Sequence, residues 1–298
     1  LSGQFFGFHN NFNTNFNLHT NLGNINFDGA LNNDDELAPL PYYFFKVHAN
    51  NVNVKEILGM KDELTVSFEA DMSGEGLTKN DIDAQMSLDF GRIKALNNEF
   101  RNVAILGDIE NQRFVVSTNV DSDILKLDLE AMMDVSDSSP AYDAKINVKK
   151  ADLYKLNLLD NDEKMVLSTN INAKLSGNDI DKIYGNVCVD NTKFTDSRGE
   201  YFMDTLNLAL TKNHFDSKDI NVSCDFFDVD VNGIFNFRNI GNSFKNYVMN
   251  HFHVNKWTDK GLRLNAEPQD FYVNLVLKNT ETLSRLLMPG LKVSENTS

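Results

Sequence analysis

The sequence contains little Pro or Trp and no long apolar run. Its 298 residues include 5 Pro and 1 Trp, and no uninterrupted apolar stretch is longer than that from Tyr42 to Phe45. A membrane-spanning helix needs about 20 consecutive apolar residues, and the first residues lack the basic, apolar and small-residue order of a signal peptide. We therefore expect no helix of this sequence to cross a bilayer, and any targeting or anchoring segment to lie outside it.

Positive charge and cysteine are also scarce. The 28 Lys and Arg residues stand against 43 Asp and Glu, a net charge of -15 at pH 7. Nucleic acids and anionic membrane surfaces bind clusters of Lys and Arg, so we expect no nucleic-acid partner. Cys188 and Cys224 are too few for a disulfide framework. They form at most one bridge, and because both lie in alternating strand patterns we favour small apolar fillers.

What the sequence does contain is apolar residues in a repeating order. Hydrophobic residues make up 41% of the chain and include 22 Phe, which excludes a disordered chain. The segment 64–74 returns as 167–177, a period of roughly 100 residues. Both copies alternate apolar and polar residues, which is the pattern of a β-strand with one dry and one wet face. Both end at a Ser-Gly pair that we predict to be a turn.

A second shared element is a strand that runs into a short apolar segment. It is found at 45–58, at 144–156 and at 272–287. The spacing of the apolar residues at the end of each copy is typical of a helical turn packed on a sheet. We therefore predict short helical turns near 55–60, 152–159 and 281–288.

These repeats predict one continuous all-β chain, built as an elongated antiparallel repeat sheet. The expected units are a partial unit at 1–41, a unit at 42–140, a unit with an extra hairpin at 141–269, and the start of a truncated unit at 270–298. A repeat unit cannot bury its apolar face alone, and neither end of the sequence carries a capping variant. We therefore expect this sequence to be an interior piece of a longer repetitive protein.

No motif for catalysis or metal binding stands out. His251 and His253 share one face of an expected strand, but no Cys, Asp or Glu at ligand spacing accompanies them. Asp121-Ser-Asp123 and the acidic segment 160–163 resemble halves of a calcium loop without its Gly and distal Glu. The repeated positions are apolar, whereas the polar positions differ between copies. We therefore expect no enzyme, no bound metal and no cofactor.

The recurring feature is an apolar strand face, and its residues form the candidate site. If two sheets packed against each other, these residues would fill a sandwich core. If one sheet curled without closing, they would line an apolar trough suited to acyl chains. The sequence leaves both alternatives open. The candidate groove-lining residues are Leu64, Val66, Phe68, Met86, Leu88, Phe90, Leu125, Leu127, Leu129, Leu167, Ile171, Leu175, Val187, Val189, Leu206, Leu208, Leu210, Val229, Val231, Phe271, Val273, Leu275 and Leu277.

Several segments resemble the TamB family, the inner-membrane-anchored translocation and assembly module proteins of the AsmA-like group. The resemblance is diffuse, follows the repeats, and covers nearly the whole chain. The segments that carry it are 43–58, the pairs Ser73-Gly74 and Ser176-Gly177, 151–158, 175–186 and 277–292.

The resemblance implies a taco-like, repeating β-groove rod that crosses the periplasm, with this chain as an interior segment. The parent protein would be anchored in the inner membrane by a helix and would meet an Omp85-type outer-membrane barrel. Both would involve regions outside this chain. The implied function is carriage of phospholipids, held by their acyl chains, between the inner and outer membranes in support of outer-membrane biogenesis.

Two other functions stay open at this point. A scaffold or chaperone would hold nascent β-barrel strands on the apolar face without carrying lipid. An extracellular β-solenoid adhesin or glycan-active enzyme is the third, although a single Trp257 disfavours a sugar-stacking platform. For the lipid function, no pocket of Arg and Lys is evident in the sequence. We therefore expect lipid headgroups to stay in water.

Overall fold

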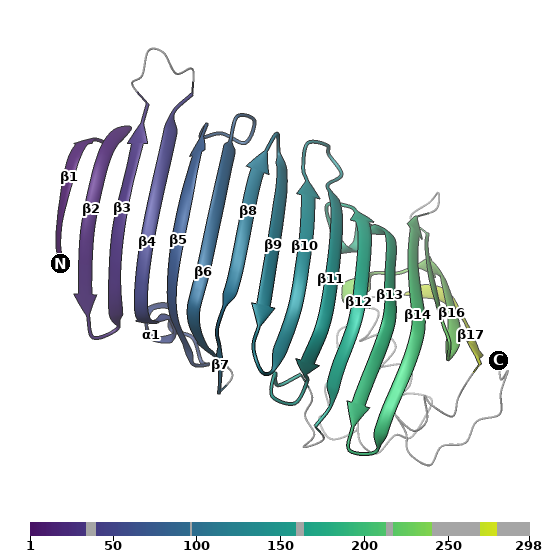
Figure 1. Cartoon of the computed structure of the whole chain (residues 1–298). Coiled ribbons are helices and arrows are strands. Elements are labelled where there is room, and N and C mark those ends of the chain that lie inside the picture. The colour runs from purple at the N-terminus through teal and green to yellow at the C-terminus, as the bar shows by residue number, and fades with distance from the viewer. Residues whose placement is uncertain (34–39, 96, 159–163, 213–216, 240–268, 279–298) are drawn as a thin grey trace, which may run out of the picture. The chain divides into compact units, whose positions relative to one another are not determined.

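A computed structural model describes residues 1–33, 40–95, 97–158, 164–212, 217–239 and 269–278. Of these residues 72% lie in strands, which form one open antiparallel sheet of 17 strands, with two short helices (Figure 1). The predicted all-β antiparallel repeat sheet is therefore confirmed. The strands are β1 Ser2–Phe8, β2 Asn11–Thr20, β3 Gly23–Asn32, β4 Tyr42–Asn53, β5 Leu64–Glu75, β6 Asp83–Ala95, β7 Asn98–Phe100, β8 Val103–Glu110, β9 Arg113–Asp121, β10 Leu125–Asp134, β11 Ala141–Asp152, β12 Val166–Ser176, β13 Tyr184–Asp196, β14 Gly199–Lys212, β15 Lys218–Cys224, β16 Phe227–Ile234 and β17 Asp270–Leu277.

The strands pair in chain order, as in a meander. Each of β1 to β5 pairs with the next strand, β6 pairs with both the short β7 and β8, and β8 continues to β9 and β10. At the other end of the chain β14, β15, β16 and β17 pair in sequence. Short hairpin connections favour this local pairing, because antiparallel strands can be joined by a few residues.

The chain divides into two compact units. Unit 1 comprises residues 1–138, 142–172 and 191–202, and unit 2 comprises 139–141, 173–190 and 203–298. The unit boundaries expected from the sequence, at 41/42, 140/141 and 269/270, coincide with the connections before β4, β11 and β17. They mark repeats rather than compact units, and they stay a prediction.

The repeat is visible in one backbone hydrogen bond that occurs three times. The amide at the end of a long strand donates to a carbonyl in the turn of an earlier hairpin. The three bonds join Asn53 to Leu22 (2.7 Å), Asp152 to Ile124 (2.8 Å) and Lys278 to Phe226 (2.8 Å). The three acceptors follow one another at the roughly 100-residue period predicted from the sequence.

The first of the predicted helical turns is the helix α1, Val54–Leu58. The Asn53 side chain accepts a hydrogen bond from the Glu56 amide (3.1 Å), and Gly59 ends the helix in the left-handed conformation. The second forms hydrogen-bonded turns at 153–157, and Asp152 caps it in the same way by accepting from the Lys155 amide (3.1 Å). The third expected turn, at 281–288, lies outside the described residues.

The expected turn at Ser176-Gly177 follows β12, but the expected turn at Ser73-Gly74 needs a correction. Ser73 and Gly74 lie inside β5, and the turn comes two residues later at Gly76, whose amide donates to the Pro41 carbonyl (2.8 Å). The matching bond in the later copy runs from Gly177 to the Pro140 carbonyl (2.9 Å). The sequence alignment was therefore shifted by two residues. Because side chains alternate with a period of two, such a shift leaves every residue assigned to its correct face.

Candidate functional site

Unit 1 has one apolar face, which we define by the cross-strand register of β2 to β10. Residues directly opposite one another in an antiparallel pair share a face. One row of partners runs Ile25, Ala49, Phe68, Phe90, Val103, Val120 and Leu127, and a second runs Phe27, Val47, Ala70, Leu88, Ile105, Thr118 and Leu129. No charged residue lies in either row.

Aromatic side chains lie close together where the apolar face crosses β2 to β4. The rings of Phe16 and Phe27 stack with centroids 4.9 Å apart, and Phe27 is 5.9 Å from Phe45. Gly29 lies directly opposite Phe45, and a Cβ at Gly29 would come within 2.6 Å of the Phe45 ring. The missing side chain at Gly29 is therefore the space that the Phe45 ring occupies.

The opposite face of unit 1 is polar and carries cross-strand ion pairs. Lys46 lies 3.1 Å from Asp71, and Lys149 lies 2.5 Å from Asp128. The hydrogen bond from Lys149 holds the pKa of Asp128 below its ordinary value. These side chains are exposed, so each pair contributes little to stability. They keep this face in water.

The central part of the apolar face is not covered by any described residue. Met86 and Val116 lie on strands that have neighbours on both sides, yet these two side chains are 39% and 37% exposed. Within the described residues no large side chain is fully buried anywhere. Side chains of this face therefore contact one another along the sheet, without a second layer over them.

Both ends of the apolar face contain buried residues. At one end Tyr43 and Ala84 are 5% and 2% exposed, and the other end is covered by the predicted helical turns. Ala49, Val52 and Val66 are buried there beneath Val54, the first residue of α1. A second small core contains Phe100, Val103 and Ile124, and Leu156 of the 153–157 turn packs against it. Both cores lie where the predicted helical turns meet the sheet. The repeated turns therefore close the end of each section of the face.

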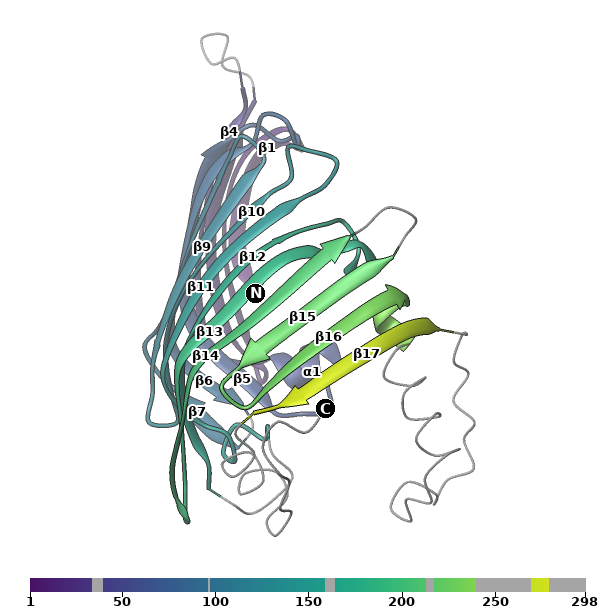
Figure 2. The same cartoon turned by 90° about the vertical axis from the view of Figure 1, so that its right-hand side faces the viewer.

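Unit 2 contains the paired strands β14 to β17 (Figure 2), which have an apolar face of their own. Its central row runs Leu210, Ile220, Val231 and Val273, and the next row runs Leu208, Val222, Val229 and Leu275. Leu206 faces Cys224, and Phe227 faces Leu277. Cys188 and Cys224 are free thiols, half-buried and buried respectively, and their role as apolar fillers stays a prediction.

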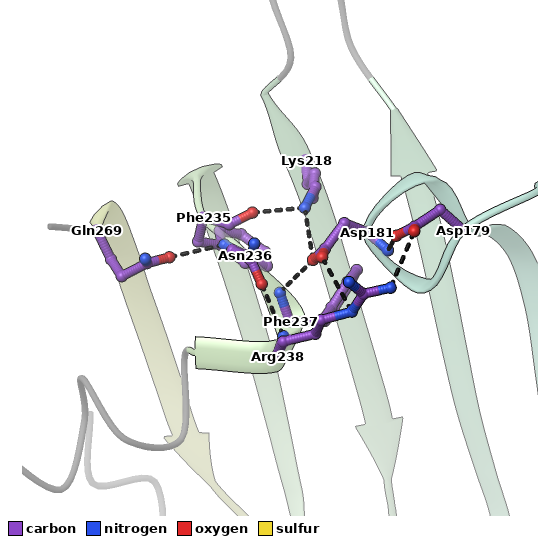
Figure 3. Close-up of polar contacts among 8 residues, drawn as sticks. All are labelled: Asp179, Asp181, Lys218, Phe235, Asn236, Phe237, Arg238 and Gln269. Carbon is purple, nitrogen blue, oxygen red and sulfur yellow. Dashed lines mark hydrogen bonds and ion pairs between the residues drawn. The ribbon is translucent and has the colours of Figure 1, made fainter. Parts of the chain in front are cut away.

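One end of the unit 2 face is a cluster of charged and aromatic side chains (Figure 3). The Lys218 ammonium lies 3.5 Å from Asp181 Oδ1 and donates to the Phe235 carbonyl. It also lies over the rings of Phe235 and Phe237, 5.3 and 4.8 Å from their centroids. Asp181 belongs to the 3-10 helix η1, Ile180–Lys182, between β12 and β13, and it accepts from the Phe237 amide (2.5 Å). Sequence reasoning missed this cluster because its members are far apart in the chain.

The candidate groove-lining residues divide between these faces. Those of β5, β6 and β10 lie together on the apolar face of unit 1, and those of β14, β16 and β17 lie together on the apolar face of unit 2. Leu167, Ile171 and Leu175 are spaced four residues apart in β12. Val187 and Val189 are two residues apart in β13. That these residues line a groove stays a prediction.

The polar face of unit 1 contains apolar residues that the alternating pattern did not reveal. Phe44, Leu106 and Val115 line a hollow of about 560 Å³ beside Lys46 and Asp71. Leu106 is 56% exposed. The three side chains lie on different strands and become neighbours only when the strands pair, so alternation within one strand does not group them.

The described residues hold no group of three His, Cys, Asp or Glu side chains that could bind a metal ion. His251, His253 and the acidic segment 160–163 lie outside the described residues. No helix in the described part of the chain is long and apolar enough to cross a membrane. The expectation of a non-enzymatic protein therefore stays a prediction.

The chain matches no protein-family model, no curated protein and no solved structure.

Proposed function

We propose that the apolar faces of this protein bind the acyl chains of phospholipids. With the resemblance to the TamB family, this extends to a periplasmic segment that carries phospholipids between the inner and outer membranes. The membrane anchor and the Omp85-type barrel partner of that proposal belong to regions outside this chain. The observation that carries the proposal is the uncharged apolar face across β2 to β10, whose centre has exposed side chains such as Met86 and Val116.

The chemistry of the face suits movement as well as binding. Each CH₂ group removed from water contributes about 0.8 kcal/mol, so an acyl chain gains several kcal/mol by lying on the face. Neighbouring rows offer similar Leu, Val, Ile and Phe side chains, so an acyl chain binds with a similar free energy at each row. A chain would therefore stay on the face and still exchange between rows.

Adjacent residues of β8 provide a matched pair of variants for the test. Ile105 lies on the apolar face between Leu88 and Thr118, whereas Leu106 lies on the polar face between Ser87 and Ser117. We expect Ile105→Asp to lower the affinity for dioctanoyl phosphatidylcholine at least tenfold, because a carboxylate would interrupt the apolar rows. Leu106→Asp places the same charge one residue away and should leave the affinity unchanged.

Both variants are measured by isothermal titration, with circular dichroism to verify the fold. Equal affinities of the two variants for the lipid, with both folded, would contradict the proposal. Unfolding of Ile105→Asp alone would show that the face is a closed core, which would also contradict it.

The scaffold function rests on a different observation. The strand β1 (sequence SGQFFGF) carries no charge, and Phe6 and Phe8 are exposed. The exposed Phe side chains of β1 offer an uncharged apolar surface to a nascent strand. A peptide copy of a β-barrel strand that binds the chain, and that is not displaced by dioctanoyl phosphatidylcholine, would favour the scaffold function.

A further inference from the structure

The hollow on the polar face of unit 1 continues into a second hollow on the same face. The first holds about 560 Å³ and extends over β4 to β9. The second holds about 450 Å³ and extends over β9 to β11, and Val115 and Ser117 line both. Each volume lies within the ordinary range of ligand pockets. The residues of the two hollows form one surface, which we call the polar-face strip.

Apolar side chains of the polar-face strip are exposed to solvent. Leu106 is 56%, Val115 39% and Phe44 36% exposed. All three belong to strands that are paired on both sides, so their exposure is not that of a sheet edge. Exposed apolar groups that are rimmed by polar residues are typical of an interaction site.

Two carboxylates of the polar-face strip have no partner within the described residues. Asp108 lines the first hollow and Glu130 lines the second. Neither side chain makes a hydrogen bond or an ion pair with another described residue. Asp108 is the register partner of Val115, and Glu130 is that of Ser117, two residues further along β9. The two carboxylates therefore lie on the strands that flank β9.

The other charged side chains of the polar-face strip balance one another. Lys46 lies 3.1 Å from Asp71, and the second hollow contains one further charge of each sign, on Asp143 and Lys145. Carboxylates are ionised at pH 7. Asp108 and Glu130 therefore give the strip a net negative charge, which attracts a cationic partner.

Uncharged polar side chains lie between the apolar residues and the carboxylates. Gln85, Ser87 and Ser117 line the first hollow, and their side chains make no hydrogen bond with a described residue. Hydroxyl and amide groups both donate and accept, so they can bind the N–H and C=O groups of a peptide backbone. An oligopeptide therefore finds all three kinds of contact on this surface.

The length of the polar-face strip also favours a peptide. From β4 to β10 it crosses five successive strand pairings, which is about 24 Å at the usual spacing of strands. An extended peptide rises about 3.3 Å per residue, so about seven residues span that length. A compact small molecule would occupy one hollow and leave the other open.

We propose that the polar-face strip binds an extended segment of a partner protein that carries apolar and basic residues within about seven positions. Its apolar side chains enter the hollow beside Phe44, Leu106 and Val115. Its Lys or Arg side chains pair with Asp108 and Glu130. The inference does not depend on the proposed function, because the strip lies on the opposite face of the sheet from the apolar rows.

The test compares three end-capped peptides that separate charge from apolar contact. Their sequences are KLKLKLK, KSKSKSK and ELELELE, and each is titrated into the whole chain by isothermal calorimetry. We expect KLKLKLK to bind at least tenfold more tightly than either of the others at low salt, with an affinity that falls as salt is added. KSKSKSK lacks the apolar groups that the hollow accepts, and ELELELE is repelled by the carboxylates.

Variants then locate the bound peptide. Asp108→Asn/Glu130→Gln should weaken the binding of KLKLKLK about tenfold, because it removes both unpaired carboxylates. The control Asp89→Asn/Glu69→Gln removes the same charges from register partners of the polar face that line neither hollow, and should leave the affinity unchanged. Leu106→Ser should weaken binding about fivefold, because it removes the most exposed apolar side chain of the strip.

Circular dichroism verifies the fold of each variant, and every contrary outcome overturns the proposal. Equal losses in the two double variants would show a general attraction to a chain with a net charge of -15. KSKSKSK or ELELELE binding as tightly as KLKLKLK would remove the role of the hollow or of the carboxylates. Unchanged affinity in Leu106→Ser, or no binding of KLKLKLK at all, would show that the strip does not hold such a segment.

Discussion

The apolar face of unit 1 has a covered end and an uncovered centre, and the same kinds of residue form both. At the covered end α1 and the 153–157 turn bury Val66, Val103 and Ile124. In the centre, residues such as Met86 and Val116 remain more than one third exposed. The difference lies in what packs over the sheet and not in the sheet itself. Burial is therefore greater at the covered end than in the centre of the face.

Unit 2 differs from unit 1 at the end of its apolar face. Charged side chains form its end, with Lys218 held between Asp181 and two aromatic rings. In unit 1 the covered end is apolar throughout its two small cores. The covered end of unit 1 is thus formed by apolar packing, whereas the end of the unit 2 face is formed by charged and aromatic contacts.

The largest expected effect comes from a charge in the covered end. Val66→Asp should lower the free energy of unfolding by about 3–5 kcal/mol, because it buries a carboxylate without a partner. Thr65→Asp, on the opposite face next to Lys94, is the control and should change stability little. Urea unfolding measures both. Similar losses in Val66→Asp and in Ile105→Asp would remove the distinction between the covered end and the uncovered centre.

The hairpin turns that accept the repeated hydrogen bond offer a smaller contrast. Ile124 is buried whereas Leu22, at the equivalent position, is half-buried. Ile124→Ala should therefore cost about 2–4 kcal/mol, and Leu22→Ala clearly less. Thermal or urea unfolding of the two variants measures the difference. Equal losses of stability would contradict the expectation that the more buried side chain contributes more.

The cap of α1 should have a smaller effect still. Asn53→Ala removes the acceptor for the Glu56 amide and should cost about 1 kcal/mol. Asn50→Ala, three residues earlier on the exposed polar face, serves as the control. Stability that is the same in both variants would show that α1 does not need this cap to cover the face.

The smallest effect on stability is expected from a substitution on the polar face, and it should depend on pH. The pKa of Asp128 is lowered in the folded chain by the hydrogen bonds from Lys149 and Asn119. A carboxyl with a lowered pKa stabilises the fold above its unfolded pKa of about 4, and this contribution disappears as the pH falls through the folded value. Asp128→Asn should therefore lower the urea midpoint slightly at pH 7. A difference from the unmodified chain that persists at pH 2.5 would contradict this assignment.

The sequence predicted the strand faces well because alternation is a local property. Leu64, Val66 and Phe68 could be placed on one face from their spacing alone, and a two-residue error at Gly74 did not change that face. The first helical turn was predicted from the apolar residues that follow the strand, and Asn53 and Gly59 cap it in the structure. Features that depend on the register between strands could not be predicted from the sequence. Lys212 and Lys218 become opposite partners only after β14 and β15 pair, and Asp181 reaches Lys218 from the connection before β13.

The most direct test of the central claim is native mass spectrometry of the chain purified from cells, with extraction and identification of bound lipid. If the apolar faces hold acyl chains, phospholipid should co-purify at more than trace stoichiometry. It should be reduced in Ile105→Asp and retained in Leu106→Asp. A folded chain with no bound phospholipid in any of the three proteins would contradict the claim that these faces bind lipid.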